Sequence, residues 1–182
     1  MLTLTEKPGT GVARLQPPNA ALSVVLVSEF QAGETRDWRE ERRMLEALAR
    51  QDIGVDFDVI LVESEAARGS QVPDDFARIM PAGVKVVYGP FDQSSPLKNF
   101  AVEHCNAALI AVLETDVTPD PGWLGRLYAR ALEAPDYDVF TARTNYGLDT
   151  MWRRVCSVLD RTFDDYGKSG PSHHISNHAA LY

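Results

Sequence analysis

Short apolar runs alternate with amphipathic segments along most of this chain. Runs rich in Val, Ile and Leu predict buried strands, and apolar residues at three- and four-residue spacing predict helices. The predicted strands are 22–27, 56–62, 84–88, 109–113 and 136–142, and the predicted helices are 34–51, 76–80, 98–108, 121–134 and 148–166. Such alternation implies right-handed crossovers. We therefore expect an α/β fold with a Rossmann-like, mostly parallel sheet and helices on both faces.

Residues 1–21 do not follow this pattern. They contain Pro8, Gly9, Gly11, Pro17 and Pro18 with little periodicity, so we expect a flexible N-terminal arm. The remaining segment, 22–182, has a suitable length for one domain with a full hydrophobic core. The tryptophans at 38, 123 and 152 occur at helical spacing, which predicts positions in this core or at its edge.

The charge and hydropathy of the chain argue against two classes of protein, those that bind nucleic acids and those that span membranes. The formal charge of −8 and the pI near 5.0 argue against a nucleic-acid partner, because phosphate contacts need a basic surface. No apolar run reaches the ~20 residues of a membrane-spanning helix. The start of the chain also lacks the basic and apolar regions of a secretory signal. We expect a cytoplasmic protein with no transmembrane segment.

Acidic residues follow two of the predicted buried strands. Glu63 and Glu65 come after the strand at 56–62, and Glu114 and Asp116 come after the strand at 109–113. If the chain stays extended, Glu114 and Asp116 point to the same side. The carboxyl edge of a parallel sheet is where open α/β folds bind ligands, and carboxylates there are suitable ligands for Mg²⁺ or Mn²⁺. Such an acidic pair can also be a solvated turn or a helix cap.

Other nucleotide-binding signals are missing or ambiguous. Residues 27–31 contain no glycine, so neither the dinucleotide fingerprint nor the Walker loop follows the first strand. Any nucleotide must then be held by carboxylates and a metal. Lys98 is predicted at a helix start, where its positive charge is slightly unfavourable with the helix dipole unless an anion is bound there. This indicates an anion-binding residue, although a surface lysine is the alternative. His174 and His178 could form a metal site if a helix brought them together, and one of them could instead complete a site at Asp116.

Several short motifs occur in a fixed order. They are Ser23-Val24-Val25-Leu26, Gln51, Val62-Glu63-Ser64-Glu65, Lys98-Asn99, Glu114-Thr115-Asp116 and Pro119-Asp120-Pro121-Gly122-Trp123-Leu124. The series resembles the nucleotide-sugar domain of the family 2 glycosyltransferases, an inverting family with the GT-A fold. In that family a basic-Asn helix precedes a strand closed by Asp-x-Asp, with Pro-x-Pro behind it. The resemblance covers roughly residues 22–182.

The resemblance implies roles for the acidic residues at the strand ends. Glu63 and Glu65 would hydrogen-bond the base or ribose of a nucleoside diphosphate sugar. Glu114 would lie near the ribose or the metal, and Asp116 would bind Mn²⁺ or Mg²⁺ directly. The metal would bridge the diphosphate and stabilise it as the leaving group.

The same resemblance implies further binding residues. Lys98 and Asn99 would lie beside the nucleotide. Arg143 and Asn177 would line the donor sugar and the acceptor. The donor would be a nucleoside diphosphate sugar, and the acceptor a hydroxyl of an unidentified saccharide, lipid or protein.

This chain departs from the family pattern at several positions. Glu63 and Glu114 stand where the family usually has Asp, and residues 27–30 differ from its usual base-binding loop. The family's acidic general-base motif does not occur before Tyr182, so we expect an incomplete acceptor part and assign no catalytic base.

The leading interpretation is a metal-dependent inverting glycosyltransferase. One alternative is a nucleotidyltransferase, although that class usually has a glycine-rich, basic first loop. Another is a degenerate GT-A domain that binds a nucleotide or a partner without turnover.

Overall fold

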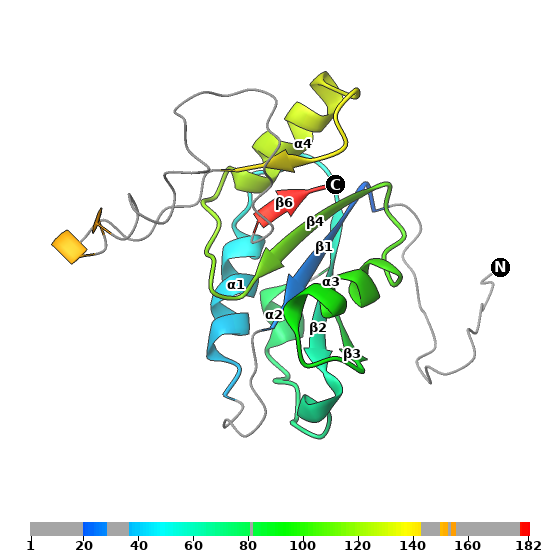
Figure 1. Ribbon diagram of the computed structural model, residues 1–182, viewed down its shortest axis with the longest axis vertical. Coiled ribbons are helices and arrows are strands. Elements are labelled where there is room, and N and C mark those ends of the chain that lie inside the picture. The colour runs from blue at the N-terminus through cyan, green and yellow to red at the C-terminus, as the bar shows by residue number, and fades with distance from the viewer. Residues whose placement is uncertain (1–19, 29–36, 81, 143–149, 153, 156–178) are drawn as a thin grey trace.

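The computed structural model describes residues 20–28, 37–80, 82–142, 150–152, 154–155 and 179–182 (Figure 1). The strands are β1 (Leu22–Val27), β2 (Phe57–Ser64), β3 (Val84–Gly89), β4 (Leu109–Glu114), β5 (Phe140–Thr141) and β6 (Ala179–Leu181). The helices are α1 (Arg39–Ala49), α2 (Phe76–Ile79), α3 (Ser94–Val102) and α4 (Trp123–Glu133), with a short 3₁₀ helix, η1 (Glu65–Ala67). Among the described helices, none is long and apolar enough to cross a membrane.

All of these strands belong to one mixed sheet. Its order is β3-β2-β1-β4-β6-β5, and β1 lies at the centre between β2 and β4. The β1–β2, β2–β3 and β1–β4 pairs are parallel, whereas β6 is antiparallel to both β4 and β5. The parallel strands are joined through helices, as the alternating sequence pattern requires. The prediction of an α/β fold with a mostly parallel sheet is confirmed.

Helices cover both faces of the sheet. On one face, α1, α2 and α4 pack on the larger core, in which Leu26, Leu61 and Leu113 are strand residues. On the other face, α3 packs on a smaller core that includes Val25 and Val112 (Figure 1). Alternate residues of β1 and β4 enter different cores, which explains why residues 24–27 of β1 and 109–113 of β4 are apolar without interruption.

The helix α3 differs from its predicted range. It begins at Ser94 rather than Lys98 and ends at Val102 rather than Ala108. Pro96 lies in the first turn, where proline is tolerated because its missing N–H would have had no intrahelical acceptor. Lys98 therefore lies inside the helix, and the prediction that it occupies a helix N-terminus is wrong.

Three other predictions need correction. The chain has a last strand, β6, which was not expected because a strand of this length has too few residues for a recognisable pattern. The predicted strand at 136–142 is shortened to β5. Trp38 and Trp123 lie in the core as predicted, but Trp152 is 72% exposed, because helical spacing alone does not identify a packing partner. The predicted arm 1–21 lies almost entirely outside the described residues.

The side chain of Gln51 connects the end of α1 to the start of α4. Its Nε2 donates to the carbonyl of Asp120 at 2.8 Å and to that of Ala47 at 3.2 Å. Its Oε1 accepts a hydrogen bond from the Leu124 N–H at 2.8 Å, which satisfies a first-turn amide of α4 that has no intrahelical partner. The side chain thus fixes the segment that leads from the acidic turn into α4.

We expect Gln51→Ala to lower the free energy of unfolding by about 1–2 kcal/mol, because three backbone groups, two of them in part-buried hydrogen bonds, lose this partner. Gln51→Glu should cost at least as much, since it replaces the donor that faces two carbonyl oxygens. Urea denaturation would measure both, with the exposed Gln71→Ala as the control. Equal stability of Gln51→Ala and Gln71→Ala would contradict the connecting role.

Candidate functional site

The carboxyl ends of β1, β2 and β4 meet at one edge of the sheet. Val27 pairs with Val62 on one side and with Glu114 on the other. Just beyond these pairs, the Ser28 N–H donates to the Val62 carbonyl at 3.1 Å, and the Thr115 N–H donates to the Val27 carbonyl at 3.1 Å. The segments that follow all three strands therefore start side by side, as the sequence pattern predicted.

A buried ion pair closes one side of this edge. Lys98 Nζ, from α3, donates a hydrogen bond to Glu114 Oε1, at the end of β4. Glu114 comes two residues after Val112 in the strand, so its side chain points toward the same face, the one that α3 covers. The two residues are only 8% and 3% exposed. Two residues that we predicted near the nucleotide are thus brought together by the fold.

Asp116 lies in a different environment from Glu114. The chain turns directly after β4, and the Val117 N–H donates to the Glu114 carbonyl at 3.2 Å. The extended geometry that would place both acids on one side therefore does not persist, and that expectation is wrong. Asp116 is exposed, and within the part of the chain that the structure describes its carboxylate forms no hydrogen bond or ion pair. It is available for a ligand.

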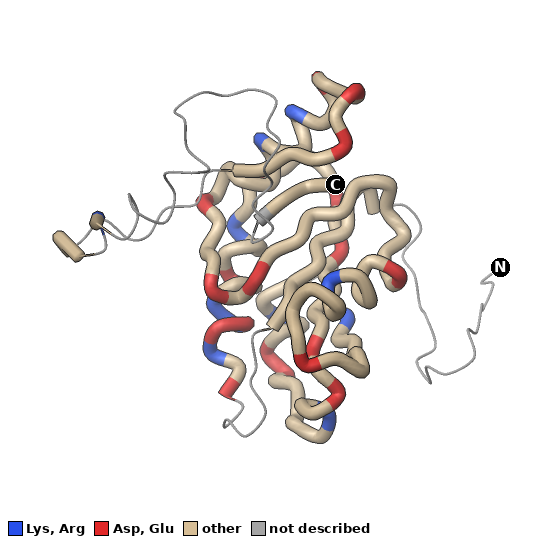
Figure 2. Tube along the Cα trace, in the orientation of Figure 1, with Lys and Arg blue, Asp and Glu red and all other residues tan. Residues whose placement is uncertain are grey.

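A second cation approaches the same turn from the opposite face of the sheet. Arg43, on the first turns of α1, donates a hydrogen bond from Nη2 to the Thr115 carbonyl at 3.1 Å. Figure 2 shows acidic positions at the carboxyl end of β4 close to basic positions of α1. We call residues 114–116 the acidic turn; it is flanked by Lys98 on the α3 side and Arg43 on the α1 side. The sequence contains no signal for Arg43, because a run of mixed charges on a helix is typical of a solvated face.

Glu63 and Glu65 are separated by the fold. Glu63 is still part of β2, two residues after Leu61, and is fully buried on the same face, which α1 and α2 cover. Glu65 is exposed in η1 and paired with Arg68, whose guanidinium lies 4.8 Å from the centroid of the Tyr88 ring. The hydrogen bond from Arg68 lowers the pKa of Glu65 below its ordinary value.

A further buried carboxylate lies near the end of β1. The Ser28 hydroxyl donates to Glu41 Oε1 at 2.9 Å, and Glu41, on α1, is only 2% exposed. The sequence gives no signal for it, since Glu41 belongs to the same run of mixed charges as Arg43. The hydrogen bond connects the first turns of α1 to the residue directly after β1.

The remaining predicted residues are less informative. Asn99 is exposed on α3, next to the buried Lys98. Arg143 and Asn177 lie outside the described residues, as do His174 and His178. Their predicted roles stay predictions.

The donor set around the acidic turn can be compared with the needs of Mg²⁺ or Mn²⁺. Among the described residues there is no group of three His, Cys, Asp or Glu side chains that could hold a metal. One oxygen of Glu114 is engaged by Lys98, whereas Asp116 is exposed and available. One carboxylate is compatible with these cations, which commonly keep water and substrate phosphates as their other ligands. The residues therefore fit a metal that is completed by a bound diphosphate.

Comparison with known families identifies the chain. The family model described as glycosyl transferase family 2 matches residues 37–182, which is most of the sequence. The chain belongs to glycosyl transferase family 2. The match includes α1 and β2 through β6, and therefore both cations and the acidic turn. The predicted family and GT-A-like fold class are confirmed.

Three solved structures to which the chain is similar share little sequence identity with it. A crystal structure of S. aureus TarS in complex with UDP has 16% sequence identity and a TM-score of 0.43 and aligns over 71% of this chain and 40% of that chain. The apo-form glycosyltransferase GlyE of Streptococcus pneumoniae TIGR4 has 14% sequence identity and a TM-score of 0.37, and the alignment covers 84% of this chain and 41% of that chain. A CMP:2-keto-3-deoxy-manno-octonic acid synthetase complexed with CTP has 12% sequence identity and a TM-score of 0.41, and the alignment covers 64% of this chain and 50% of that chain.

The alignments thus span half or less of each of these three structures. No curated protein sequence matches the chain significantly.

Proposed function

We propose that this family 2 domain binds a nucleoside diphosphate sugar at the carboxyl edge of its sheet and transfers the sugar to an acceptor hydroxyl with inversion. The observation that carries the proposal is the acidic turn. Asp116 offers an available carboxylate in this turn, which Lys98 contacts at Glu114 and Arg43 contacts at Thr115 from the opposite face of the sheet. An anionic ligand that is bound through a divalent cation suits this combination of charges.

In the proposed reaction, the acceptor oxygen forms a bond with the anomeric carbon from the side opposite the diphosphate. The bond between that carbon and the diphosphate oxygen breaks, and its electron pair leaves with the diphosphate. The acceptor proton passes to a general base, to which no residue is assigned. A metal held by Asp116 would supply positive charge to the departing diphosphate.

The other named residues would act on the donor before the bond breaks. Glu114 matches the charge of Lys98, so this buried pair would hold the acidic turn in position for the donor. Glu63 lies at the end of β2, beside β1, where the resemblance places the base or ribose. Glu65 would first have to release Arg68 to reach a nucleotide.

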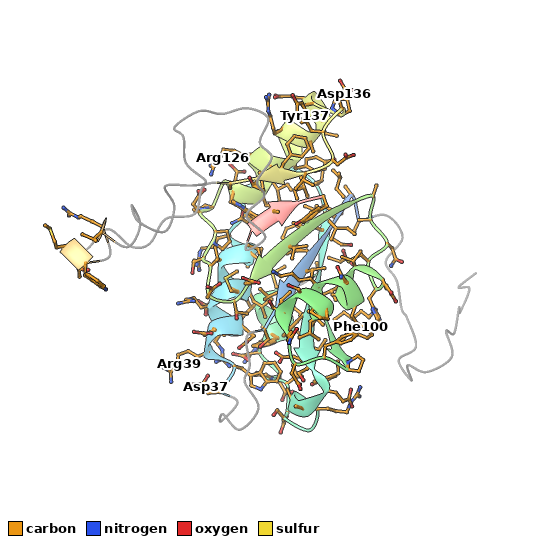
Figure 3. All side chains as sticks on the ribbon, in the orientation of Figure 1. Asp37, Arg39, Phe100, Arg126, Asp136 and Tyr137 are labelled. Carbon is orange, nitrogen blue, oxygen red and sulfur yellow. The ribbon has the colours of Figure 1, made fainter. Side chains whose placement is uncertain are left out.

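The test is calorimetric titration of UDP and GDP with Mn²⁺ and with a chelator. We expect one of the nucleotides to bind more tightly with Mn²⁺, and Asp116→Asn to weaken that binding by about tenfold or more, equivalent to about 1.4 kcal/mol. Asp136→Asn is the matched control, because this exposed aspartate lies beyond α4, away from the carboxyl ends of β1 and β2 (Figure 3). Absence of binding by the folded wild-type protein would refute the proposal.

A second candidate is a nucleotide-binding domain without turnover. It is favoured by the internal pairing of two predicted site acids, Glu65 with Arg68 and Glu114 with Lys98. Nucleotide binding without transfer or hydrolysis of the matching nucleotide sugar would support this candidate. Preferential binding of a nucleoside triphosphate, with release of pyrophosphate when a sugar phosphate is added, would instead indicate a nucleotidyltransferase.

A further inference from the structure

Arg43 differs from the other arginines of α1 in its partner. Arg39 pairs with Asp37 at 3.0 Å, and Arg42 donates to both oxygens of Asp75 at 3.0 and 3.2 Å. Arg43 instead donates to the uncharged carbonyl of Thr115. Within the described ranges no carboxylate forms an ion pair with it, and its other N–H groups form no hydrogen bond. Its charge and most of its donors are therefore available.

The carbonyl that Arg43 contacts lies directly before Asp116 in the acidic turn. It belongs to the peptide bond that joins Thr115 to Asp116, so the guanidinium lies next to the backbone of the exposed carboxylate. The hydrogen bond also connects α1 to a segment 72 residues later in the chain. Because Thr115 itself is fully buried, the contact anchors the guanidinium at a fixed part of the turn.

Of the two cationic residues at the acidic turn, Arg43 is the one whose charge is not matched by a carboxylate among the described residues. The charge of Lys98 is matched by Glu114, with which it forms a buried ion pair. A diphosphate at Asp116 brings several negative charges, and one divalent cation neutralises only part of them. A guanidinium with unused N–H groups can bind phosphate oxygens through two parallel hydrogen bonds, which gives both strength and orientation.

We propose that Arg43 is a diphosphate-binding residue of the donor site and that its hydrogen bond to Thr115 holds it beside Asp116. This inference rests on the proposed function. It adds a specificity residue from α1 and makes recognition of the donor depend on its phosphates directly, in addition to the metal. Removal of the metal would then weaken nucleotide binding without removing the contribution of Arg43.

The experiment compares wild type with Arg43→Gln and Arg43→Lys, using UDP and GDP by calorimetry, with Mn²⁺ and with a chelator. Binding of the corresponding nucleoside is measured by ligand-observed NMR. The nucleoside is uridine if UDP binds and guanosine if GDP binds. We expect Arg43→Gln to weaken diphosphate binding by about tenfold to a hundredfold under both conditions, as for a charge-assisted hydrogen bond. Arg43→Lys should recover part of this loss, and nucleoside binding should not change.

Arg39→Gln is the matched control. Arg39 is an exposed arginine of the same helix, lies beside Asp37 at its start and has no contact with the acidic turn among the described residues (Figure 3). We expect it to leave diphosphate affinity unchanged, and thermal unfolding should show that both glutamine variants are folded.

The possible outcomes separate this inference from the proposed function. If wild type binds the diphosphate and Arg43→Gln binds it equally well, the inference is wrong and the proposed function stands. A loss seen only with Mn²⁺ would also overturn the inference, since Arg43 would then act solely by positioning Asp116. If Arg43→Gln weakened nucleoside binding as much as diphosphate binding, the inference would also be overturned, because Arg43 would then not act on the phosphates. If wild type binds neither UDP nor GDP, both proposals fall.

Discussion

Lys98→Met is expected to lower the free energy of unfolding by about 3–5 kcal/mol. The substitution removes the buried cation that pairs with Glu114, and breaking a buried ion pair is costly because water does not solvate the remaining charge. Glu114→Gln should cost less than Lys98→Met, because the amide oxygen still accepts a hydrogen bond from the lysine. The double variant Lys98→Met/Glu114→Gln should be more stable than Lys98→Met alone, since it removes both charges. Urea denaturation of the four proteins gives the interaction energy.

A surface ion pair provides the control for this prediction. Arg130 and Glu133 are 3.2 Å apart on α4, and both side chains are more than half exposed, at 61% and 65%. Arg130→Met should change stability by about 0.5 kcal/mol at most, because water solvates either charge alone. A similarly small effect of Lys98→Met would mean that the Lys98–Glu114 pair is solvated in solution.

Gly125→Ala is expected to destabilise the protein by about 3 kcal/mol. Gly125 lies in α4, and a Cβ at this position would be 2.2 Å from the carbonyl oxygen of Asp52. The contact is with backbone, so α4 would have to move away from the end of α1. That movement would break the hydrogen bond from the Asp52 N–H to the Pro121 carbonyl, which is 2.7 Å long. The gain in helix propensity, about 1 kcal/mol, is too small to offset these losses.

Gly54→Ala is the matched control for Gly125→Ala. Gly54 has no atom within 4 Å of the Cβ position, so the substitution should change stability by about 0.5 kcal/mol or stabilise slightly. Thermal unfolding of both variants would measure the difference. Equal melting temperatures would show that α1 and α4 are not in close contact at this point.

The candidate site was predictable where residues lie directly after a buried strand. Apolar runs identified β2 and β4, and the acids that end them were therefore placed at the carboxyl edge. The side-chain environments were not predictable. Glu63 and Glu65 are close in sequence, but one is fully buried and the other is exposed and paired with Arg68. The difference depends on where β2 ends, which periodicity locates only approximately.

Residues that reach the site from the helices were the hardest to predict. Arg43 and Glu41 occupy one run of mixed charges, yet one contacts the acidic turn and the other is buried against Ser28. Charge patterns on a single helix contain no information about a strand that is distant in the sequence. Contacts of this kind depend on the order of strands in the sheet and on the helix that covers each face.

The sequence by itself determined the alternation of strands and helices, the mostly parallel sheet, the family resemblance and the position of Asp116 after a buried strand. Local patterns suffice for these features, because burial imposes a periodicity on each strand and helix separately. Only the tertiary structure decided that Lys98 pairs with Glu114, that Arg43 contacts Thr115 and that β6 extends the sheet beside β4. These contacts join segments 16 to 72 residues apart, and their geometry depends on how complete layers pack.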